Sequence, residues 1–153
     1  MPHLMADWLV ERAKRRWPDR RIATAPLDEV PAGDVELVAP GDRERVLAGA
    51  ERAAAHELDL LGTGPFSLGR PADWHTDVKT GTTWPPAWWR EIEYAQLGRP
   101  SDVKVPWEIS RLQWLLPAGQ AFLLDGDERH ARTARETVDD WIAANPYGAS
   151  VNW

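Results

Sequence analysis

Two short stretches of the sequence hold residue types that together could bind a charged, ring-shaped ligand. Residues 74–85, WHTDVKTGTTWP, alternate indole rings with a histidine, an aspartate and a lysine. Residues 102–111, DVKVPWEISR, bring cationic and acidic side chains to the start of a predicted helix. Indole faces suit the C–H faces of pyranose rings, and Lys or Arg side chains hold carboxylates or sulfates. We therefore expect a site for an acidic carbohydrate.

The second stretch carries an anion preference that depends on helix geometry. The first backbone N–H groups of a helix and its dipole favour negative charge, and Lys104 and Arg111 would strengthen that preference. Glu108 and Arg111 are three residues apart, so they share a helical face and are predicted to pair. Such a pair is more often structural than catalytic. A purely structural role for Glu108 and Arg111 therefore stays open.

The histidine and the tryptophans also have structural interpretations. An alternative for His75 is a loop histidine that only donates to a backbone carbonyl. Trp88 and Trp89 are adjacent and cannot both face inward, so one of them is expected to border a cleft. The other helical tryptophans have the spacing of core residues and are predicted to pack: Trp107, Trp114 and Trp141.

The composition excludes several classes of site. With 153 residues, 43% hydrophobic content and ten tryptophans, the chain can form a single globular domain with a core. Its net charge of −6 argues against general nucleic-acid binding, although cations focused in one cleft can still bind a polyanion. His56, His75 and His130 form no HxH or HxxxH pair and no cysteine is present, so no metal and no cofactor are expected. The N-terminus has no apolar run long enough for a signal peptide or a membrane span.

The elements that must position these stretches are predicted to be helices. Boundary signals place them at residues 4–17, 43–56 after a capping Asp42, 85–97, 105–126 with a kink at Pro117, and 128–145 after a capping Asp127. Residues 60–85 show no helical period and are expected to form ordered turns. The last helix is expected to bury the stripe Ala131, Ala134, Val138, Trp141 and Ile142. The predicted fold class is all-α, with antiparallel helix pairs joined by long irregular loops.

Four segments follow one another in an order that resembles a known family. They are HELDLLGTGPFSLG, DWHTDVKTGTTWPPAWW, DVKVPWEISRLQWLLPAGQAFLLDGDE and DDWIAANPYGASVNW. Together they resemble the N-terminal domain of the heparinase II/III-like polysaccharide lyases, in which an (α/α) toroid precedes a β-sandwich. The resemblance covers residues 56–153, which would form part of an incomplete toroid, with residues 1–55 as a variable helical lead-in. Pro117 departs from the pattern of the family.

The resemblance implies β-elimination of a uronate-containing glycan, such as heparan sulfate or alginate. One group neutralises the C5 carboxylate, a base removes the C5 proton and an acid protonates the departing O4. The asparagine, histidine and tyrosine that usually fill these roles are expected beyond Trp153, as are the rest of the toroid and the β-sandwich. This chain alone is therefore expected to be an inactive N-terminal portion of a lyase. Family members often work in the periplasm, yet no export signal is visible.

The resemblance leaves the substrate-binding side of the cleft to this chain. His75 is the candidate for direct chemistry. The residues expected at or near the cleft are Trp74, His75, Asp77, Lys79, Trp84, Lys104, Glu108, Arg111, Asn152 and Trp153. Two alternatives stay open: a non-catalytic module that binds acidic glycans, and a truncated toroid that exposes an unpaired helical face and exists only as an oligomer or a poorly folded fragment.

Overall fold

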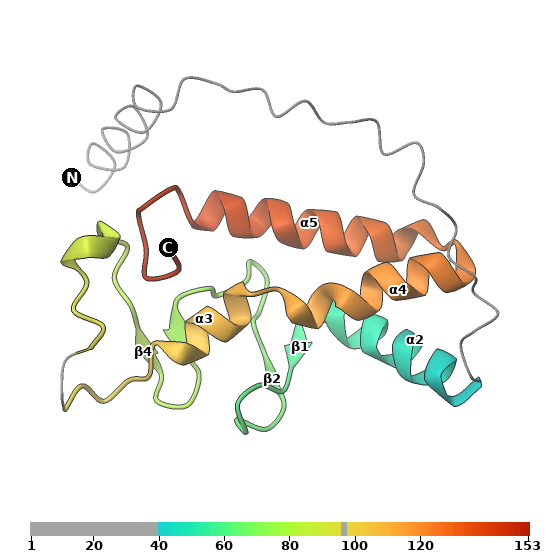
Figure 1. Cartoon of the computed structure of the whole chain (residues 1–153), viewed down its shortest axis with the longest axis horizontal. Helices are drawn as coiled ribbons and strands as arrows, with labels where there is room; N and C mark the ends of the chain where they lie inside the picture. Colours follow the sequence, from blue (N-terminus) through green and yellow to red (C-terminus); the bar gives the residue numbers. More distant parts are fainter. Residues whose placement is uncertain (1–39, 96–97) are drawn as a thin grey trace, which may run out of the picture.

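The computed structural model of the chain describes residues 40–95 and 98–153, so the helix predicted over residues 4–17 lies outside the described residues. In this part the α-helices are α2 (Pro40–Ala54), α3 (Lys104–Ser110), α4 (Leu116–Asp125) and α5 (Glu128–Ala144) (Figure 1). Two short 3-10 turns, η3 (Trp89–Glu91) and η4 (Gln113–Leu115), lie between them. The strands are β1 (Glu57–Leu58), β2 (Phe66–Ser67), β3 (Thr76–Asp77) and β4 (Thr82–Thr83).

The segment between α2 and α3 contains two short antiparallel strand pairs. β1 pairs with β2, and β3 pairs with β4. Gly62 and Gly81 have positive φ in the two turns, a backbone conformation that glycine adopts without steric cost. The prediction of ordered turns is confirmed, and the predicted all-α class is confirmed in part. The described part is mostly helical with a few strands, which are too short to give the alternating pattern that sequence analysis detects.

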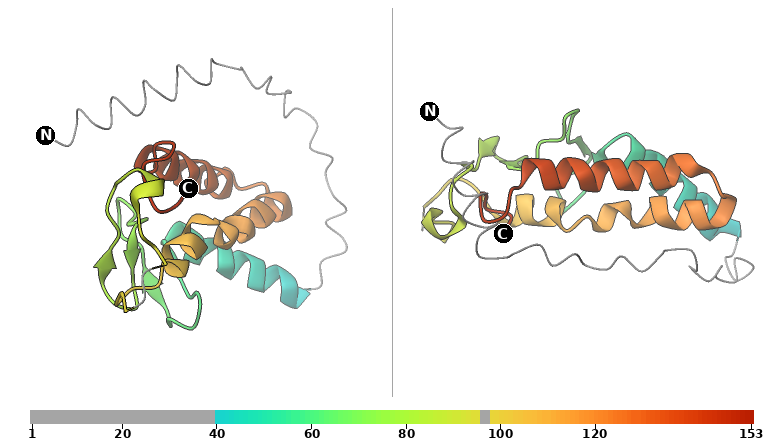
Figure 2. Two further views of the ribbon diagram at one scale, coloured as in Figure 1. Left: turned by 60° about the vertical axis from the view of Figure 1, so that its left-hand side comes forward. Right: turned by 90° about the horizontal axis from the view of Figure 1, so that it is seen from above.

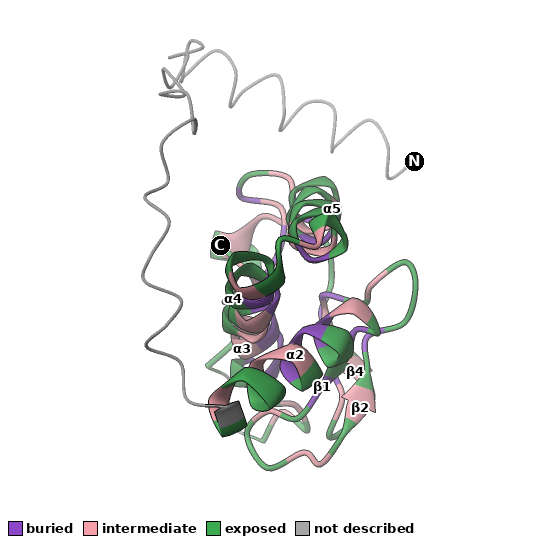
Figure 3. Cartoon of the chain, turned by 90° about the vertical axis from the view of Figure 1, so that its right-hand side faces the viewer, coloured by how far each residue is buried: buried purple, intermediate pink, exposed green. Residues whose placement is uncertain are grey.

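Small side chains allow the long helices to pack closely. α4 lies against both α2 and α5 and runs antiparallel to them (Figures 1 and 2). A Cβ atom on Gly49 of α2 would lie 2.8 Å from Cβ of Pro117 in α4, so glycine is required at this approach. The residues at or below 1% exposure on these two helices are Ala50, Ala53, Ala118 and Ala121. Buried positions face inward on all three helices (Figure 3). None of the described helices has the length and apolar character of a membrane span.

Two hydrophobic clusters hold the irregular segment against the helices. The first contains Leu58, Leu68, Trp74, Val105 and Ile109, so it joins β1, the loops and α3. The second contains Trp84, Ile92, Val103 and Val151, and it brings the C-terminal loop against the hairpin of β3 and β4. These clusters place α3 and the C-terminal loop next to each other.

The helix predicted over residues 105–126 is wrong as a single kinked helix. The chain breaks at Leu112, whose φ of 56° is left-handed, and α4 starts again at Leu116. Pro117 therefore lies in the first turn of α4, where its missing N–H leaves no helical hydrogen bond unmade. The break ends α3 directly after Ser110 and leaves Arg111 at its exit.

The helix predicted over residues 85–97 is also wrong, because the described residues 85–95 form only the turn η3. Trp88 and Ile92, which flank the turn, have extended ψ angles of 125° and 109°. The backbone N–H of Trp89 donates to the carbonyl oxygen of Gly148 at 2.9 Å. A long-range hydrogen bond to the C-terminal loop thus replaces the hydrogen bonds that a helix would form here.

The ends and the buried face of the other helices differ in part from the prediction. Asp127 caps α5 as predicted, since its side chain accepts from the N–H of Arg129 at 2.9 Å. Asp42 lies within the first turn of α2 and does not cap it. The predicted buried stripe of α5 is wrong: Val138 and Ile142 are 37% and 57% exposed, and Ala131 is exposed. The helix is rotated so that His130 and Thr137 face inward, with Ala134 and Trp141 half-buried.

Candidate functional site

A cavity of about 290 Å³ lies where the end of α3 meets the C-terminal loop. The residues that line it are Trp107, Ser110, Arg111, Asn152 and Trp153. Three of them, Arg111, Asn152 and Trp153, belong to the predicted site. Trp107 is instead predicted to pack in the core, and Ser110 is not among the predicted site residues.

Both indoles of the cavity are held by hydrogen bonds to the backbone. Nε1 of Trp107 donates to the carbonyl oxygen of Val151 at 2.6 Å. Nε1 of Trp153 donates to the carbonyl oxygen of Asn145 at 3.1 Å, and the ring centroid lies 5.6 Å from that of Trp141. Because their N–H groups are occupied, these two side chains present their apolar carbon surfaces to the cavity. Trp153 is 44% exposed, so a ligand can reach it.

The cation of the cavity is Arg111, which pairs with Glu108 as the spacing predicts. Its side chain is 59% exposed, whereas that of Glu108 is 24% exposed. A guanidinium has five N–H donors, and the recorded bond to the carboxylate uses Nη1. The remaining donors are able to bind a carboxylate or sulfate in the cavity.

Two side-chain oxygens at the cavity have no hydrogen-bond partner among the described residues. They are Oγ of Ser110 and Oδ1 of Asn152, and both atoms are buried. Buried polar atoms in folded proteins are almost always hydrogen-bonded to protein, water or ligand. These two oxygens are therefore unpartnered polar atoms buried in the wall of the cavity, with almost no surface open to it.

Behind the cavity lies a network of buried side chains that includes His75. Nδ2 of Asn152 donates to Oδ1 of Asn145 at 2.9 Å and to the carbonyl oxygen of Trp74 at 3.0 Å. Nε2 of His75 lies 3.0 Å from the same oxygen of Asn145. Burial lowers the pKa of His75 below its ordinary 6.5, and the Asn145 hydrogen bond and the charge of Asp73 oppose this shift only in part. His75 supports the cavity through Asn145 and does not line it.

Comparison with known proteins gives two matches, while no family model matches the chain. A heparin-sulfate lyase from Bacteroides stercoris is 36% identical over 45 residues, which make up 29% of this chain and 7% of that protein. The crystal structure of a mutant of heparan sulfate lyase HepC from Pedobacter heparinus matches with a TM-score of 0.50 and 22% identity, over 94% of this chain and 18% of the other. The chain is related to heparan sulfate lyases. It corresponds to a portion of these relatives, because it spans less than a fifth of the length of either.

Two tryptophans predicted to face the glycan lie instead in the core. Trp74 and Trp84 are each 1% exposed, so the prediction that their rings form a glycan-facing wall is wrong. Nε1 of Trp74 donates to Oδ2 of Asp140 at 2.8 Å, which anchors the loop to α5. The guanidinium of Arg99 lies 4.4 Å from the centroid of the Trp84 ring. Hydrophobic burial decides the position of both rings, since each belongs to a core cluster.

Asp77 is fully buried and has a structural role, which contradicts its predicted place in the cleft. Its carboxylate accepts from the N–H groups of Asp102 and Lys79, both at 2.9 Å, and from the hydroxyls of Thr80 and Ser101. Burial raises the pKa of Asp77, but these hydrogen bonds together outweigh it and hold the pKa below 3.8. The side chain ties the β3–β4 hairpin to the segment that leads into α3.

The two predicted lysines do not join Arg111 at the cavity. Lys79 is exposed, and its Nζ donates to the carbonyl oxygen of Leu61 at 2.7 Å, so it links two loops. Lys104 is exposed at the start of α3. Neither side chain lines the cavity, so the expected concentration of three cations is reduced there to Arg111.

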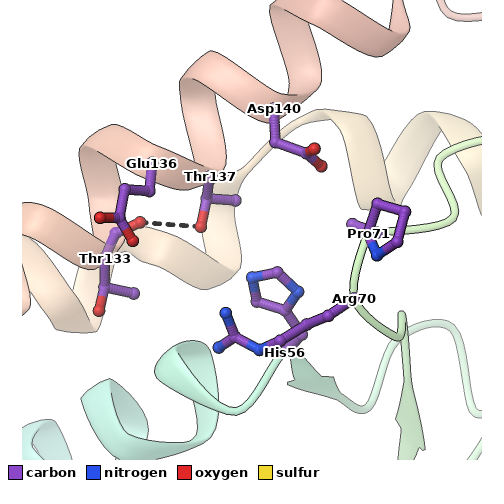
Figure 4. Close-up of a pocket in the computed structure, with 8 residues that line it drawn as sticks. His56, Arg70, Pro71, Thr133, Glu136, Thr137 and Asp140 are labelled. Atoms are coloured by element: carbon purple, nitrogen blue, oxygen red, sulfur yellow. Dashed lines mark hydrogen bonds between the residues drawn. The ribbon is translucent and has the colours of Figure 1, made fainter.

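A second cavity, of about 170 Å³, lies between α5 and residues 70–72 (Figure 4). Arg70 and His56 face it from one side, and Glu136 and Asp140 face it from α5. Asp140 already accepts from the Trp74 indole, and the Arg70 guanidinium donates to the carbonyl oxygen of Ala54. Its mixed charges do not favour an acidic ligand. No group of three or more metal-ligating side chains is found among the described residues.

Proposed function

We propose that this chain forms a glycan-binding part of a polysaccharide lyase that cleaves uronate-containing acidic glycans by β-elimination. The observation that carries the proposal is the cavity in which Arg111 and two indoles meet. The relationship to heparan sulfate lyases supports the choice of an acidic glycan over other anions.

Each part of an acidic sugar has a matching group at this cavity. The guanidinium of Arg111 suits a carboxylate or sulfate, because charge-assisted hydrogen bonds are stronger than neutral ones. The indole of Trp153 offers an apolar surface to the C–H face of a pyranose ring. Asn152 and Ser110 contribute polar side chains to the wall of the cavity.

We further propose that these 153 residues bind such a glycan without cleaving it at this cavity. β-Elimination needs a base for the C5 proton and an acid for the departing O4. The five residues that line the cavity include no histidine, tyrosine, lysine or carboxylate to fill these roles. The groups that neutralise, deprotonate and protonate the substrate would come from other parts of a longer lyase.

The outer face of α4 and α5 fits a place within a larger helical toroid. Leu116 and Leu123 of α4 are 64% and 50% exposed, and Ile142 of α5 is 57% exposed. In the proposed lyase, further helices of the toroid cover these side chains. Light scattering together with a thermal melt tests whether the isolated chain is a monomer with a cooperative transition or self-associates through exposed apolar surface.

The proposal is tested by calorimetric titration of the chain with a heparan sulfate tetrasaccharide and, in parallel, a neutral glucan tetrasaccharide. We expect saturable binding of the acidic sugar only, with no rise in the ultraviolet absorbance that reports an unsaturated uronide. Equal binding of both sugars, or of neither, would overturn the proposed site. A rise in absorbance would show that the chain cleaves by itself and would overturn the division of roles. An alginate tetrasaccharide in a third titration distinguishes the two glycan classes.

A further inference from the structure

One buried oxygen, Oδ1 of Asn145, lies within hydrogen-bond distance of three other side chains. Oγ of Ser150 and Nδ2 of Asn152 each lie 2.9 Å from it, and Nε2 of His75 lies 3.0 Å from it. Asn145 is 1% exposed and follows the last residue of α5. The sequence pattern marks this residue only as the stop of the helix, before Pro146.

The orientation of both asparagine amides follows from the chemistry of their partners. Nδ2 of Asn145 lies 2.9 Å from the carbonyl oxygen of Trp141, which can only accept, so the nitrogen faces α5 and Oδ1 faces the loop. Nδ2 of Asn152 faces the carbonyl oxygen of Trp74 for the same reason. The Oδ1 of Asn152 is therefore its unpartnered acceptor, and it is buried in the wall of the cavity.

The same oxygen fixes the proton on the imidazole of His75. Because Oδ1 of an amide can only accept, Nε2 of His75 must carry a proton to bond to it. In the neutral ring this leaves Nδ1 unprotonated. Within residues 40–95 and 98–153 no group is recorded as a hydrogen-bond partner of Nδ1.

We propose that Asn145 is a positioning residue of the glycan cavity, which holds the proton of His75 on Nε2 and orients Asn152 and Trp153 toward the bound sugar. This inference rests on the proposed function. Asn145 does not line the cavity and acts through its neighbours, because its side chain holds the Asn152 amide and its carbonyl oxygen accepts from Trp153 at 3.1 Å. Removing the side-chain amide would free His75, Ser150 and Asn152 at once, whereas the bond from Trp153 to the backbone carbonyl oxygen would remain.

The first test is Asn145→Ala, measured by titration with the heparan sulfate tetrasaccharide and by nitrogen–proton correlation spectra of the imidazoles. We expect the affinity to fall by about tenfold. We also expect the His75 signal to change from one tautomer, with the proton on Nε2, to a mixture of both. Thr137→Val is the matched control, since Thr137 is likewise buried, lies on α5, and its hydroxyl bonds among the described residues only to the carbonyl oxygen of Thr133.

A second variant, Asn145→Asp, keeps an acceptor for all three donors, adds a negative charge beside His75 and loses only the donor to the Trp141 carbonyl oxygen. It addresses the case in which Asn145→Ala does not fold. We expect the pKa of His75 to rise by about one unit, because a neighbouring carboxylate favours the imidazolium form. An unchanged His75 titration in this folded variant would overturn the positioning role.

The outcomes separate the two proposals. If the unmodified chain binds neither the acidic tetrasaccharide nor the neutral glucan tetrasaccharide, the proposed function fails. If the unmodified chain binds and Asn145→Ala retains both its affinity and the wild-type imidazole spectrum, the positioning role fails and the proposed function stands. A loss of affinity equal to that of Thr137→Val, with no change of tautomer, would also overturn the positioning role.

Discussion

The carboxylate of Asp77 accepts a hydrogen bond from the backbone N–H of Asp102, 2.9 Å away, across 25 residues of sequence. The same carboxylate closes its own hairpin by accepting from Lys79 and Thr80. The β3–β4 hairpin is thus fastened to the start of α3, the helix that carries Trp107 to the cavity and has Arg111 directly after its last residue.

Asp77→Ala is predicted to destabilise the fold by about 3 kcal/mol, because several buried donors lose their partner at once. Urea unfolding followed by tryptophan fluorescence measures the change. Asp59→Ala is the control, since Asp59 is exposed, and its expected effect is within about 0.5 kcal/mol. Equal stabilities of the two variants would contradict the fastening role of Asp77.

Acid is predicted to weaken the fold in two separate pH ranges. The pKa of His75 is lowered on folding, so the unfolded chain binds more protons and stability falls as the pH drops below 6.5. The pKa of Asp77 is also lowered, so its contribution is present above pH 3.8 and is lost as the pH falls through its folded value. Unfolding free energies of the unmodified chain and His75→Gln between about pH 7.5 and 5.5 isolate the first range. If the unfolding free energy of His75→Gln changes with pH as steeply as that of the unmodified chain, the loss of stability in this range does not come from His75.

Gly148→Ala is predicted to destabilise the C-terminal loop by about 3 kcal/mol. Its φ is 73°, and an added Cβ would lie 2.2 Å from Cζ3 of Trp88. Gly119→Ala is the opposite control, since Gly119 lies in α4 with nothing within 4 Å of an added Cβ. It is predicted to stabilise by about 0.5–1 kcal/mol, because alanine favours the helix. Thermal melts of the two variants that shift in the same direction would contradict this packing of the loop on Trp88.

Features that depend on neighbours in sequence were predictable. The capping of α5 by Asp127 and the pairing of Glu108 with Arg111 each involve residues two or three positions apart. The turns between Leu60 and Pro85 follow from glycine and proline content. Arg111, Asn152 and Trp153 were placed at the site from a resemblance of motifs, and the structure brings them to one cavity.

Features that depend on distant residues were not predictable from local pattern. His75 meets Asn145 across 70 positions, and Asn152 meets Trp74 across 78. A tryptophan in a polar loop has the same sequence signature whether it faces a sugar or fills a core. Trp74 and Trp84 fill the core because the helices leave apolar space there. The sequence does contain one signal for the buried network: Asn145, Ser150 and Asn152 lie close together on the two sides of Gly148.

The most direct test of the acidic-glycan cavity is the affinity of Arg111→Ala for a heparan sulfate tetrasaccharide at low and high salt. We predict a loss of about tenfold at low salt and a weaker salt dependence than in the unmodified chain, because the variant lacks the cation that lines the cavity. Arg135→Ala is the matched control, since Arg135 is 84% exposed on α5 and does not line the cavity, and it is predicted to bind as the unmodified chain does. Identical affinities and salt dependences for Arg111→Ala and Arg135→Ala would contradict the account.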